Sequence, residues 1–269
     1  MKQACAVIGF GEAGSTFAAS GGWLGRAKGW DKAPQRRAGV GLAGAKTGLE
    51  MAASAAEALA DAPLVLSLVT ADQALAAAEA YAPLLARHAL WCDGNSVAPD
   101  TKRAAARAVE AAGGRYVDMA IMAPVQPAGL AVPILLSGAH AAAAMPLLRD
   151  LGFANLRVVG ADVGRASAIK MIRSVMVKGL EALSDEMIAA ADAAGVAEEV
   201  LASLDASSDG RPWRERVAYN RERMSTHGTR RAAEMEQAAL TLRALGVAPL
   251  MTEGTVARQR AAARERLPA

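Results

Sequence analysis

The chain has 269 residues, of which 53% are hydrophobic and 21% are charged. This composition is typical of a folded globular protein and excludes an intrinsically disordered chain. No stretch approaches the roughly 18 uncharged apolar residues that a membrane span needs, and the short, glycine-broken N-terminal apolar run is unlike a signal peptide. We therefore expect a cytoplasmic protein with no membrane partner.

The net charge of +3 suits an enzyme that handles anionic cofactors and substrates. Nucleic-acid binding is disfavoured, because aromatic residues make up only 4% of the chain and arginines alternate with glutamates along predicted helices. The two cysteines, Cys5 and Cys92, fall in predicted strands and fit no metal-ligand spacing. We expect two buried thiols in a reducing compartment, with no metal site and no nucleic-acid partner.

Residues 4–16 predict a strand, a glycine-rich turn and a helix. In this pattern Gly9 permits a tight turn, Gly11 lets a pyrophosphate approach the backbone, and Gly14 lets the helix pack closely on the strand. The helix N-terminus adds unpaired N–H groups that favour phosphate binding. The alternative is a glycine turn that binds no ligand. The candidate cofactor-binding residues of this turn are Gly9, Phe10, Gly11, Glu12, Ala13 and Gly14.

The second predicted strand, residues 26–30, ends at Asp31. This spacing is close to the roughly 20 residues that separate the glycine motif from the ribose-binding acid of a dinucleotide site. A carboxylate there accepts hydrogen bonds from the ribose diol, which favours NAD. Two alternatives stay open: Asp31 is a turn residue at the strand end, or Lys32, Arg36 and Arg37 hold a 2′-phosphate. We predict NAD or NADP as cofactor, with NAD preferred.

Strand and helix signals then alternate up to about residue 160. Ser54 is a good N-cap for a helix that ends near residue 60, and another helix begins near residue 72. The remaining strand signals lie at residues 63–69, 89–92, 116–122 and 132–137. This alternation predicts a doubly wound parallel sheet.

In an open α/β sheet, ligands bind beyond the carboxyl ends of the strands. Besides the glycine turn and Asp31-Lys32, two segments fall at such ends: Val69-Thr70-Ala71 and Asp93-Gly94-Asn95-Ser96. We expect Val69, Thr70 and Asn95 to contact the cofactor.

The strand signals stop after Gly164. We therefore expect two domains: a Rossmann-like α/β domain over residues 1–162 and an all-helical domain over residues 163–269 that serves substrate binding and dimerisation. The predicted helices of the second domain cover residues 166–194, 198–204, 213–245 and 253–267.

Lys170 lies one turn into the first of these helices and begins a polar stripe. Ser174, Lys178, Glu181 and Asp185 follow it at steps of three or four residues. From spacing alone, the stripe is a solvated helix face on which Glu181 pairs with Lys178. The alternative is that Lys170 points into a cleft between the domains, where desolvation lowers its pKa and permits proton exchange near neutral pH.

These segments together resemble the β-hydroxyacid dehydrogenase superfamily, which includes 3-hydroxyisobutyrate and 6-phosphogluconate dehydrogenases. The glycine turn resembles the cofactor loop, residues 93–103 resemble the substrate loop, and Gly164-x5-Lys170 resembles the segment with the catalytic lysine. The C-terminal part resembles an uncharacterised helical domain found in a phosphogluconate-dehydrogenase-like subgroup.

The resemblance implies hydride transfer between NAD(P) and a small hydroxy acid or related alcohol. It implies that Lys170 is the general acid and base, that Asn95 and Ser96 orient substrate and nicotinamide, and that Ser174 hydrogen-bonds the substrate or Lys170. It also implies a homodimer.

Two departures limit what carries over. The superfamily has asparagine where this chain has Ser174, and Met122-Ala123-Pro124 replaces a Ser-Gly-Gly segment that grips the substrate carboxylate. The chain is also shorter than 6-phosphogluconate dehydrogenases, which disfavours that substrate. The alternatives are an imine reductase of the same architecture, against which Lys170 argues, and a non-catalytic NAD(P)-binding protein.

Overall fold

The structure, a computed structural model, describes residues 4–37, 48–207, 210 and 212–264. The chain divides into two compact units, Met1–Lys170 and Met171–Ala269. The division falls inside helix α7 (Arg165–Ala194), which therefore contributes to both units. The boundary that the sequence suggests, after residue 162, lies just before this helix begins.

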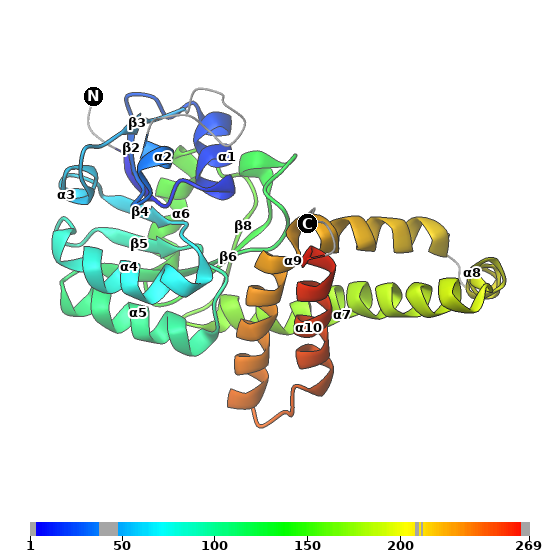
Figure 1. The fold of residues 1–269 in the computed structure, drawn as a ribbon. Helices are drawn as coiled ribbons and strands as arrows, with labels where there is room; N and C mark the ends of the chain where they lie inside the picture. Colours follow the sequence, from blue (N-terminus) through cyan, green and yellow to red (C-terminus); the bar gives the residue numbers. More distant parts are fainter. Residues whose placement is uncertain (1–3, 38–47, 208–209, 211, 265–269) are drawn as a thin grey trace. The chain divides into compact units, whose positions relative to one another are not determined.

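The described residues of the first unit form an eight-stranded sheet (Figure 1). Its strand order is β3-β2-β1-β4-β5-β6-β7-β8, and every neighbouring pair is parallel except β6 and β7. The strand order changes direction between β1 and β4, which is where open α/β sheets bind their ligands. The strands are β1 (Cys5–Ile8), β2 (Ala27–Trp30), β3 (Glu50–Met51), β4 (Leu64–Ser67), β5 (Leu90–Asp93), β6 (Arg115–Ile121), β7 (Ile134–Ser137) and β8 (Leu156–Gly160).

The α/β fold class is confirmed, but the expectation of an entirely parallel sheet is wrong at β7. A parallel neighbour requires a long crossover, usually a helix. The segment between β6 and β7 contains only the short 3₁₀ turn Gly129–Ala131, so β7 returns antiparallel to β6. The sequence analysis also missed β3, which is too short for a periodic pattern, and the edge strand β8, which is half-exposed and interrupted by Arg157.

Two layers of helices cover the sheet. Helices α1 (Glu12–Gly21) and α6 (Ala141–Asp150) pack on one face, and α3 (Ala55–Leu59), α4 (Ala74–Tyr81) and α5 (Pro99–Ala111) pack on the other. Strand β1 serves both cores, because Cys5 and Val7 face the first layer while Ala6 and Ile8 face the second. This two-sided burial explains why the strand is apolar throughout. Helix α2 (Pro34–Arg37) follows β2, and Ser54 caps α3 as predicted, its Oγ accepting from Glu57 N at 3.1 Å.

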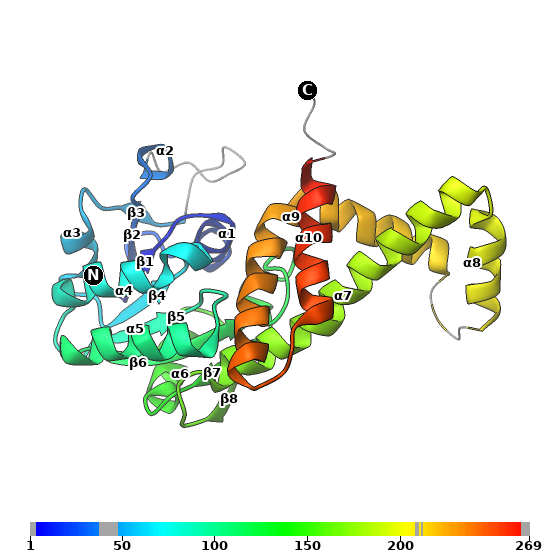
Figure 2. The ribbon, with the colours of Figure 1, turned by 60° about the horizontal axis from the view of Figure 1, so that its bottom comes forward.

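The second unit is helical, as expected. After α7 come α8 (Ala197–Ala206), α9 (Trp213–Ala244) and α10 (Leu250–Arg264), and α9 and α10 lie side by side in both views (Figures 1 and 2). Gly228 on α9 permits the close contact, since a Cβ there would lie 2.3 Å from the Gln259 carbonyl oxygen of α10. Within the described part of the chain, no helix is both long and apolar enough to cross a membrane.

Helix α7 buries its polar face, and the predicted solvated stripe is therefore wrong. Ser174, Lys178 and Glu181 are all about 5% exposed. Lys178 pairs with Glu234 of α9, and Glu181 pairs with Arg231, so the predicted pair between Lys178 and Glu181 does not form. Periodicity separates the two faces of a helix, but the partners on α9 decide which face turns inward.

Candidate functional site

The glycine turn between β1 and α1 has two glycines that its own packing requires. Gly9 has a φ of +92°, and a Cβ there would lie 2.6 Å from the Leu68 carbonyl oxygen. A Cβ on Gly14 would lie 2.5 Å from the Gly9 carbonyl oxygen. Neither position can accept a side chain without a backbone shift.

Gly11 is different, because a side chain there would meet only the end of a flexible one. The nearest atom to a Cβ at Gly11 is Nη1 of Arg36, at 3.4 Å. Among the described residues other than its chain neighbours, only the end of this one side chain comes within 4 Å of the position that a Cβ at Gly11 would occupy, at the N-terminus of α1. That geometry fits a pyrophosphate held by helix N-terminal N–H groups.

Asp31 connects the end of β2 to this turn. Its Oδ2 accepts from Phe10 N at 2.7 Å and its Oδ1 accepts from Ala33 N at 2.8 Å. Arg36 Nη1 lies 3.5 Å from Oδ2, so one guanidinium borders both Asp31 and Gly11. The turn role that the sequence left open for Asp31 is present in the structure, alongside its placement at the cofactor turn.

The remaining basic candidates differ in what the structure shows. Lys32 Nζ donates to Gln73 Oε1 at 2.5 Å, and so lies against the segment that follows β4. The side chain of Arg37 lies outside the described part of the chain. Val69 and Thr70 follow β4, and Val69 N would lie 2.8 Å from a Cβ on Gly9, so this segment borders the glycine turn. The Thr70 hydroxyl hydrogen-bonds Asp72 and is the main cause of that carboxyl's lowered pKa.

Asn95 follows β5, on the far side of β4 from the glycine turn. Its Nδ2 donates to Ser67 Oγ at 3.1 Å, and Ser67 is the register partner of Ile8, the residue before Gly9. Its Oδ1 is buried and has no hydrogen-bond partner among the described residues. A buried acceptor left without a donor costs about 1–3 kcal/mol, so this oxygen favours a ligand that brings an N–H or O–H.

Lys170 and Ser96 lie in contact. Lys170 Nζ, half-buried on the second turn of α7, donates to Ser96 Oγ at 2.6 Å. A continuous path of contacts therefore runs from the glycine turn through Ser67 and Asn95 to Ser96 and Lys170. An ammonium and a hydroxyl at this distance can pass a proton to or from a third group bound beside them.

Ser174, the other candidate on α7, is held by a different lysine. Its Oγ accepts from Lys178 Nζ at 3.4 Å, and both side chains are buried. It lies one helical turn beyond Lys170 on the same helix.

The sequence analysis missed a group of buried polar residues beneath the site. One signal was available, because an aspartate in an otherwise apolar buried strand requires a partner. The group consists of Asp93, Lys102, Tyr116 and Asp118, each at most 1% exposed. Burial, followed by the neighbouring Asp93, raises the pKa of Tyr116 well above its usual value.

The cysteines are buried and unbonded, Cys5 in β1 and Cys92 in β5. Burial raises the pKa of Cys5 to about 12, and it raises that of Cys92 as well. Neither thiol is a nucleophile at neutral pH. Among the described residues, no group of three or more His, Cys, Asp or Glu side chains is placed to hold a metal ion.

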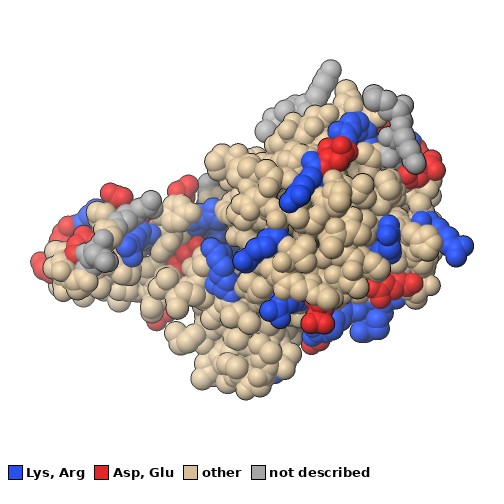
Figure 3. Space-filling model, turned by 180° about the vertical axis from the view of Figure 1, so that it is seen from behind, with Lys and Arg blue, Asp and Glu red and all other residues tan. Residues whose placement is uncertain are grey.

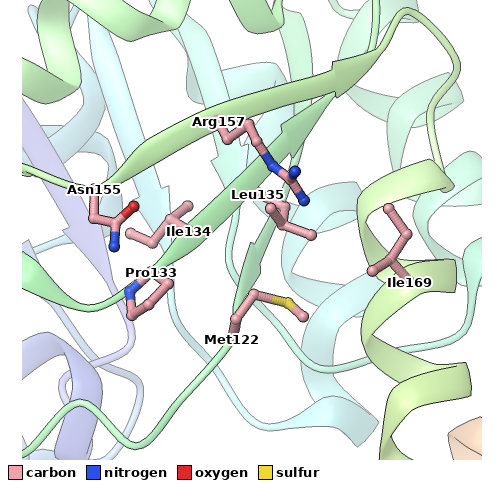
Figure 4. A pocket seen from close by; sticks show the side chains of 7 residues that line it. All are labelled: Met122, Pro133, Ile134, Leu135, Asn155, Arg157 and Ile169. Atoms are coloured by element: carbon pink, nitrogen blue, oxygen red, sulfur yellow. The ribbon is translucent and has the colours of Figure 1, made fainter.

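A hollow of about 340 Å³ lies elsewhere, at the β7–β8 edge of the sheet (Figure 4). Its walls are mainly apolar, with the Arg157 guanidinium at one side, and they include none of the candidate cofactor or catalytic residues. The lining residues are Met122, Pro133, Ile134, Leu135, Asn155, Arg157 and Ile169.

Three relatives of this chain are themselves described as hypothetical, uncharacterised or of unknown function. A conserved hypothetical protein from Sinorhizobium meliloti is 37% identical with a TM-score of 0.75, over 98% of this chain and 89% of that one. A conserved protein of unknown function, described as structurally similar to 3-hydroxyacid dehydrogenases, is 29% identical with a TM-score of 0.70, over 98% and 99%. An uncharacterised 28.5 kDa protein of Methanothermus fervidus is 30% identical over 142 residues; the match spans about half its length, 53%, and 53% of this chain.

More distant structures share the fold alone. The 3-hydroxyisobutyrate dehydrogenase of Mycobacterium tuberculosis, solved with L-serine, is 19% identical with a TM-score of 0.75, over 98% of this chain and 94% of that one. The reductive aminase of Aspergillus terreus, solved with NADPH and ethyl levulinate, is 20% identical with a TM-score of 0.62, over 98% and 95%.

Two family models match the chain. Residues 191–262 match a domain of unknown function, and residues 4–160 match the NAD binding domain of 6-phosphogluconate dehydrogenase. The second match covers more than half of the chain and contains the glycine turn, Asp31, Asn95 and Ser96. The chain therefore belongs to the family that carries the NAD binding domain of 6-phosphogluconate dehydrogenase.

Proposed function

We propose that the protein is an oxidoreductase that transfers a hydride between NAD(P) and the carbinol carbon of a small hydroxy acid or related alcohol. The observation that carries this proposal is the 2.6 Å hydrogen bond from Lys170 Nζ to Ser96 Oγ, beside the strand ends of an NAD-binding domain. The 29% identical structure described as similar to 3-hydroxyacid dehydrogenases supports the same reaction class.

The glycine turn holds the cofactor. The backbone at Gly11 and the N–H groups at the start of α1 would hold the pyrophosphate, and Asp31 and Arg36 would hold the adenosine ribose. The Asn95 Oδ1, which has no hydrogen-bond partner among the described residues, would accept from an N–H or O–H of the ligand. Bound nicotinamide supplies the hydride chemistry at C4, and the protein supplies position and electrostatic field.

Lys170 moves the proton. In oxidation, neutral Nζ takes the proton of the substrate hydroxyl as the hydride leaves the carbinol carbon; in reduction, the ammonium returns it. Ser96 Oγ holds Nζ in place through the 2.6 Å contact. Ser174, one turn further along α7, accepts from Lys178 and keeps its own O–H to donate to the substrate.

The protein acts as a homodimer, joined through α7. Opposite its buried polar face, this helix exposes four apolar side chains spaced by four, four and three residues: Ile172 (48% exposed), Met176 (67%), Leu180 (49%) and Leu183 (55%). One continuous apolar seam on a helix is suited to a second copy of the same helix, and closed two-fold pairs are the commonest oligomers.

The experiment is a panel of small hydroxy acids with NAD⁺ or NADP⁺, followed by absorbance at 340 nm. The proposal predicts reduced cofactor with at least one hydroxy acid. In a parallel assay with NADH or NADPH, oxidation of the cofactor by a ketone plus an amine, with no turnover of any hydroxy acid, would indicate an imine reductase instead. Cofactor binding without turnover of any substrate would indicate a non-catalytic nucleotide-binding protein.

A further inference from the structure

The Lys170–Ser96 pair rests on two separate parts of the fold. Ser96 lies in the loop after β5, which ends at Asp93, and Lys170 lies on α7. Asp93 is the register partner of Asp118 on the neighbouring strand β6. Two carboxylates thus lie side by side beneath the site, and both are essentially buried.

Asp93 fixes the loop that carries Ser96. Its Oδ1 accepts from Asn95 N at 2.9 Å, and its Oδ2 accepts from Tyr116 Oη at 2.6 Å. The backbone next to Ser96 is therefore tied to this carboxylate.

Asp118 fixes the start of α7. Its Oδ2 accepts from Gly164 N at 3.1 Å, from Ser167 N at 3.0 Å and from Ser137 Oγ at 3.0 Å. A carboxylate at a helix N-terminus satisfies N–H groups that have no intrahelical partner and complements the helix dipole. Lys170 is three residues after Ser167, so Asp118 sets the turn of the helix on which Lys170 stands.

Lys102 of α5 joins the two carboxylates. Its side chain is 0% exposed, and its Nζ donates to Asp93 O at 2.5 Å and to Asp93 Oδ1 at 3.0 Å. The same Nζ lies 3.5 Å from Asp118 Oδ1, an oxygen with no hydrogen-bond partner among the described residues. One buried cation thus compensates two adjacent buried anions that would otherwise repel each other.

We propose that Lys102 is a positioning residue, which sets the Lys170–Ser96 contact by holding Asp93 and Asp118 together. It touches neither member of the pair. Without its charge, the two carboxylates move apart, and each carries with it one half of the site. The role of this contact in proton transfer rests on the proposed function; the positioning itself does not.

The test measures Lys170 directly and needs no substrate. The cofactor-free protein is treated with acetic anhydride, and the acetylation of Lys170 relative to exposed Lys32 is read by peptide mass spectrometry. Ser96→Ala removes the hydroxyl that accepts from Lys170 Nζ. Its acetylation ratio is the reference value for a protein in which this contact is lost. In Ser96→Ala we expect the acetylation ratio to rise about two- to tenfold, the factor that corresponds to one hydrogen bond. In Lys102→Met we expect the acetylation ratio to rise by a similar factor.

Two further variants keep the test decisive. Val109→Ala removes buried side-chain volume two turns further along α5 without touching the network, so it controls for a general loss of packing and should keep the wild-type ratio. Asp118→Asn removes the second carboxylate charge while filling the same space, and it should also raise the acetylation ratio. This variant takes the place of Lys102→Met if Lys102→Met does not fold.

Wild-type ratios in folded Lys102→Met and Asp118→Asn, with a raised ratio in Ser96→Ala, would overturn the positioning role. A raised ratio in Lys102→Met, with no turnover of any hydroxy acid by the wild type, would support positioning and contradict the proposed function. The two ideas therefore fail separately.

Discussion

At the residue scale, we expect the cofactor choice to depend on the charges around Asp31. This carboxylate accepts from Phe10 N and Ala33 N, which holds its charge next to the glycine turn. Arg36 lies 3.5 Å from the same carboxylate and provides the opposite charge. The ribose end of the site therefore contains both an anion that repels a 2′-phosphate and a cation that attracts one.

Asp31→Asn tests which charge decides. The amide keeps an acceptor oxygen for one of the two backbone N–H groups, whereas alanine would lose both hydrogen bonds. Since the variant loses its negative charge, we expect NADP affinity to improve about tenfold relative to NAD, measured by NADH and NADPH fluorescence titration.

Arg36→Ala is the counterpart and should shift the preference toward NAD. A wild-type protein that already binds NADPH tenfold more tightly than NADH would show that Arg36, and not Asp31, selects the ribose.

At the element scale, the glycine turn separates structural from functional glycines. Gly9 and Gly14 are required by contacts with backbone atoms of the fold itself. Gly11 is required by nothing that the described residues place near it except the movable end of Arg36. We therefore propose that its missing side chain serves a ligand.

Gly11→Val should fold normally and lose the cofactor. The new side chain lies where the pyrophosphate approaches the backbone, so NAD(P)H affinity should fall by well over tenfold, about 1.4 kcal/mol or more. The measurement is a fluorescence titration together with a thermal unfolding curve.

Gly254→Val on α10 is the matched control, because a Cβ there meets nothing within 4 Å. It should bind NAD(P)H like the wild type. Unchanged affinity in Gly11→Val would remove the glycine turn from the cofactor site.

The sequence predicted the order of strands and helices because strand–helix alternation is a local signal. It failed where the arrangement depends on distant partners. The direction of β7 depends on the length of its connection to β6, and β8 is held mainly by pairing with β7. The family resemblance, and not the spacing, placed Lys170 and Ser96 in one site, and the structure brings the two side chains into contact.

Helix α7 shows the limit of periodicity. Its polar and apolar faces are both visible in the sequence, yet the polar one turns inward because Glu234 and Arg231 of α9 supply opposite charges to Lys178 and Glu181. Lys102 was missed for the same reason, since its partners Asp93 and Asp118 come from two strands.

At the scale of the whole molecule, no single sign of charge covers the face shown in Figure 3. Basic and acidic side chains are interspersed on the face shown in Figure 3, and much of that face carries neither. We therefore expect self-association to use apolar surface, such as the exposed apolar face of α7.

The wild type should sediment as a dimer at micromolar concentration, and Met176→Glu with Leu180→Glu should make it a monomer. Burial of each of these side chains contributes about 1.5–3 kcal/mol, so each charge should weaken association by more than tenfold. Leu24→Glu is the control, because Leu24 is 69% exposed, much like Met176, but belongs to the first unit. A wild-type monomer would contradict the α7 interface.

The central claim is that Lys170 transfers the proton, and the most direct test is the turnover rate of Lys170→Ala. The control is Lys28→Ala, which removes a surface lysine paired with Glu57; Lys178 is unsuitable because it is buried against Glu234. The Lys170→Ala rate should fall roughly 10²- to 10⁴-fold with NAD(P)H affinity unchanged, and Lys170→Arg should not restore it, since a guanidinium stays protonated. Wild-type turnover in Lys170→Ala would contradict the account.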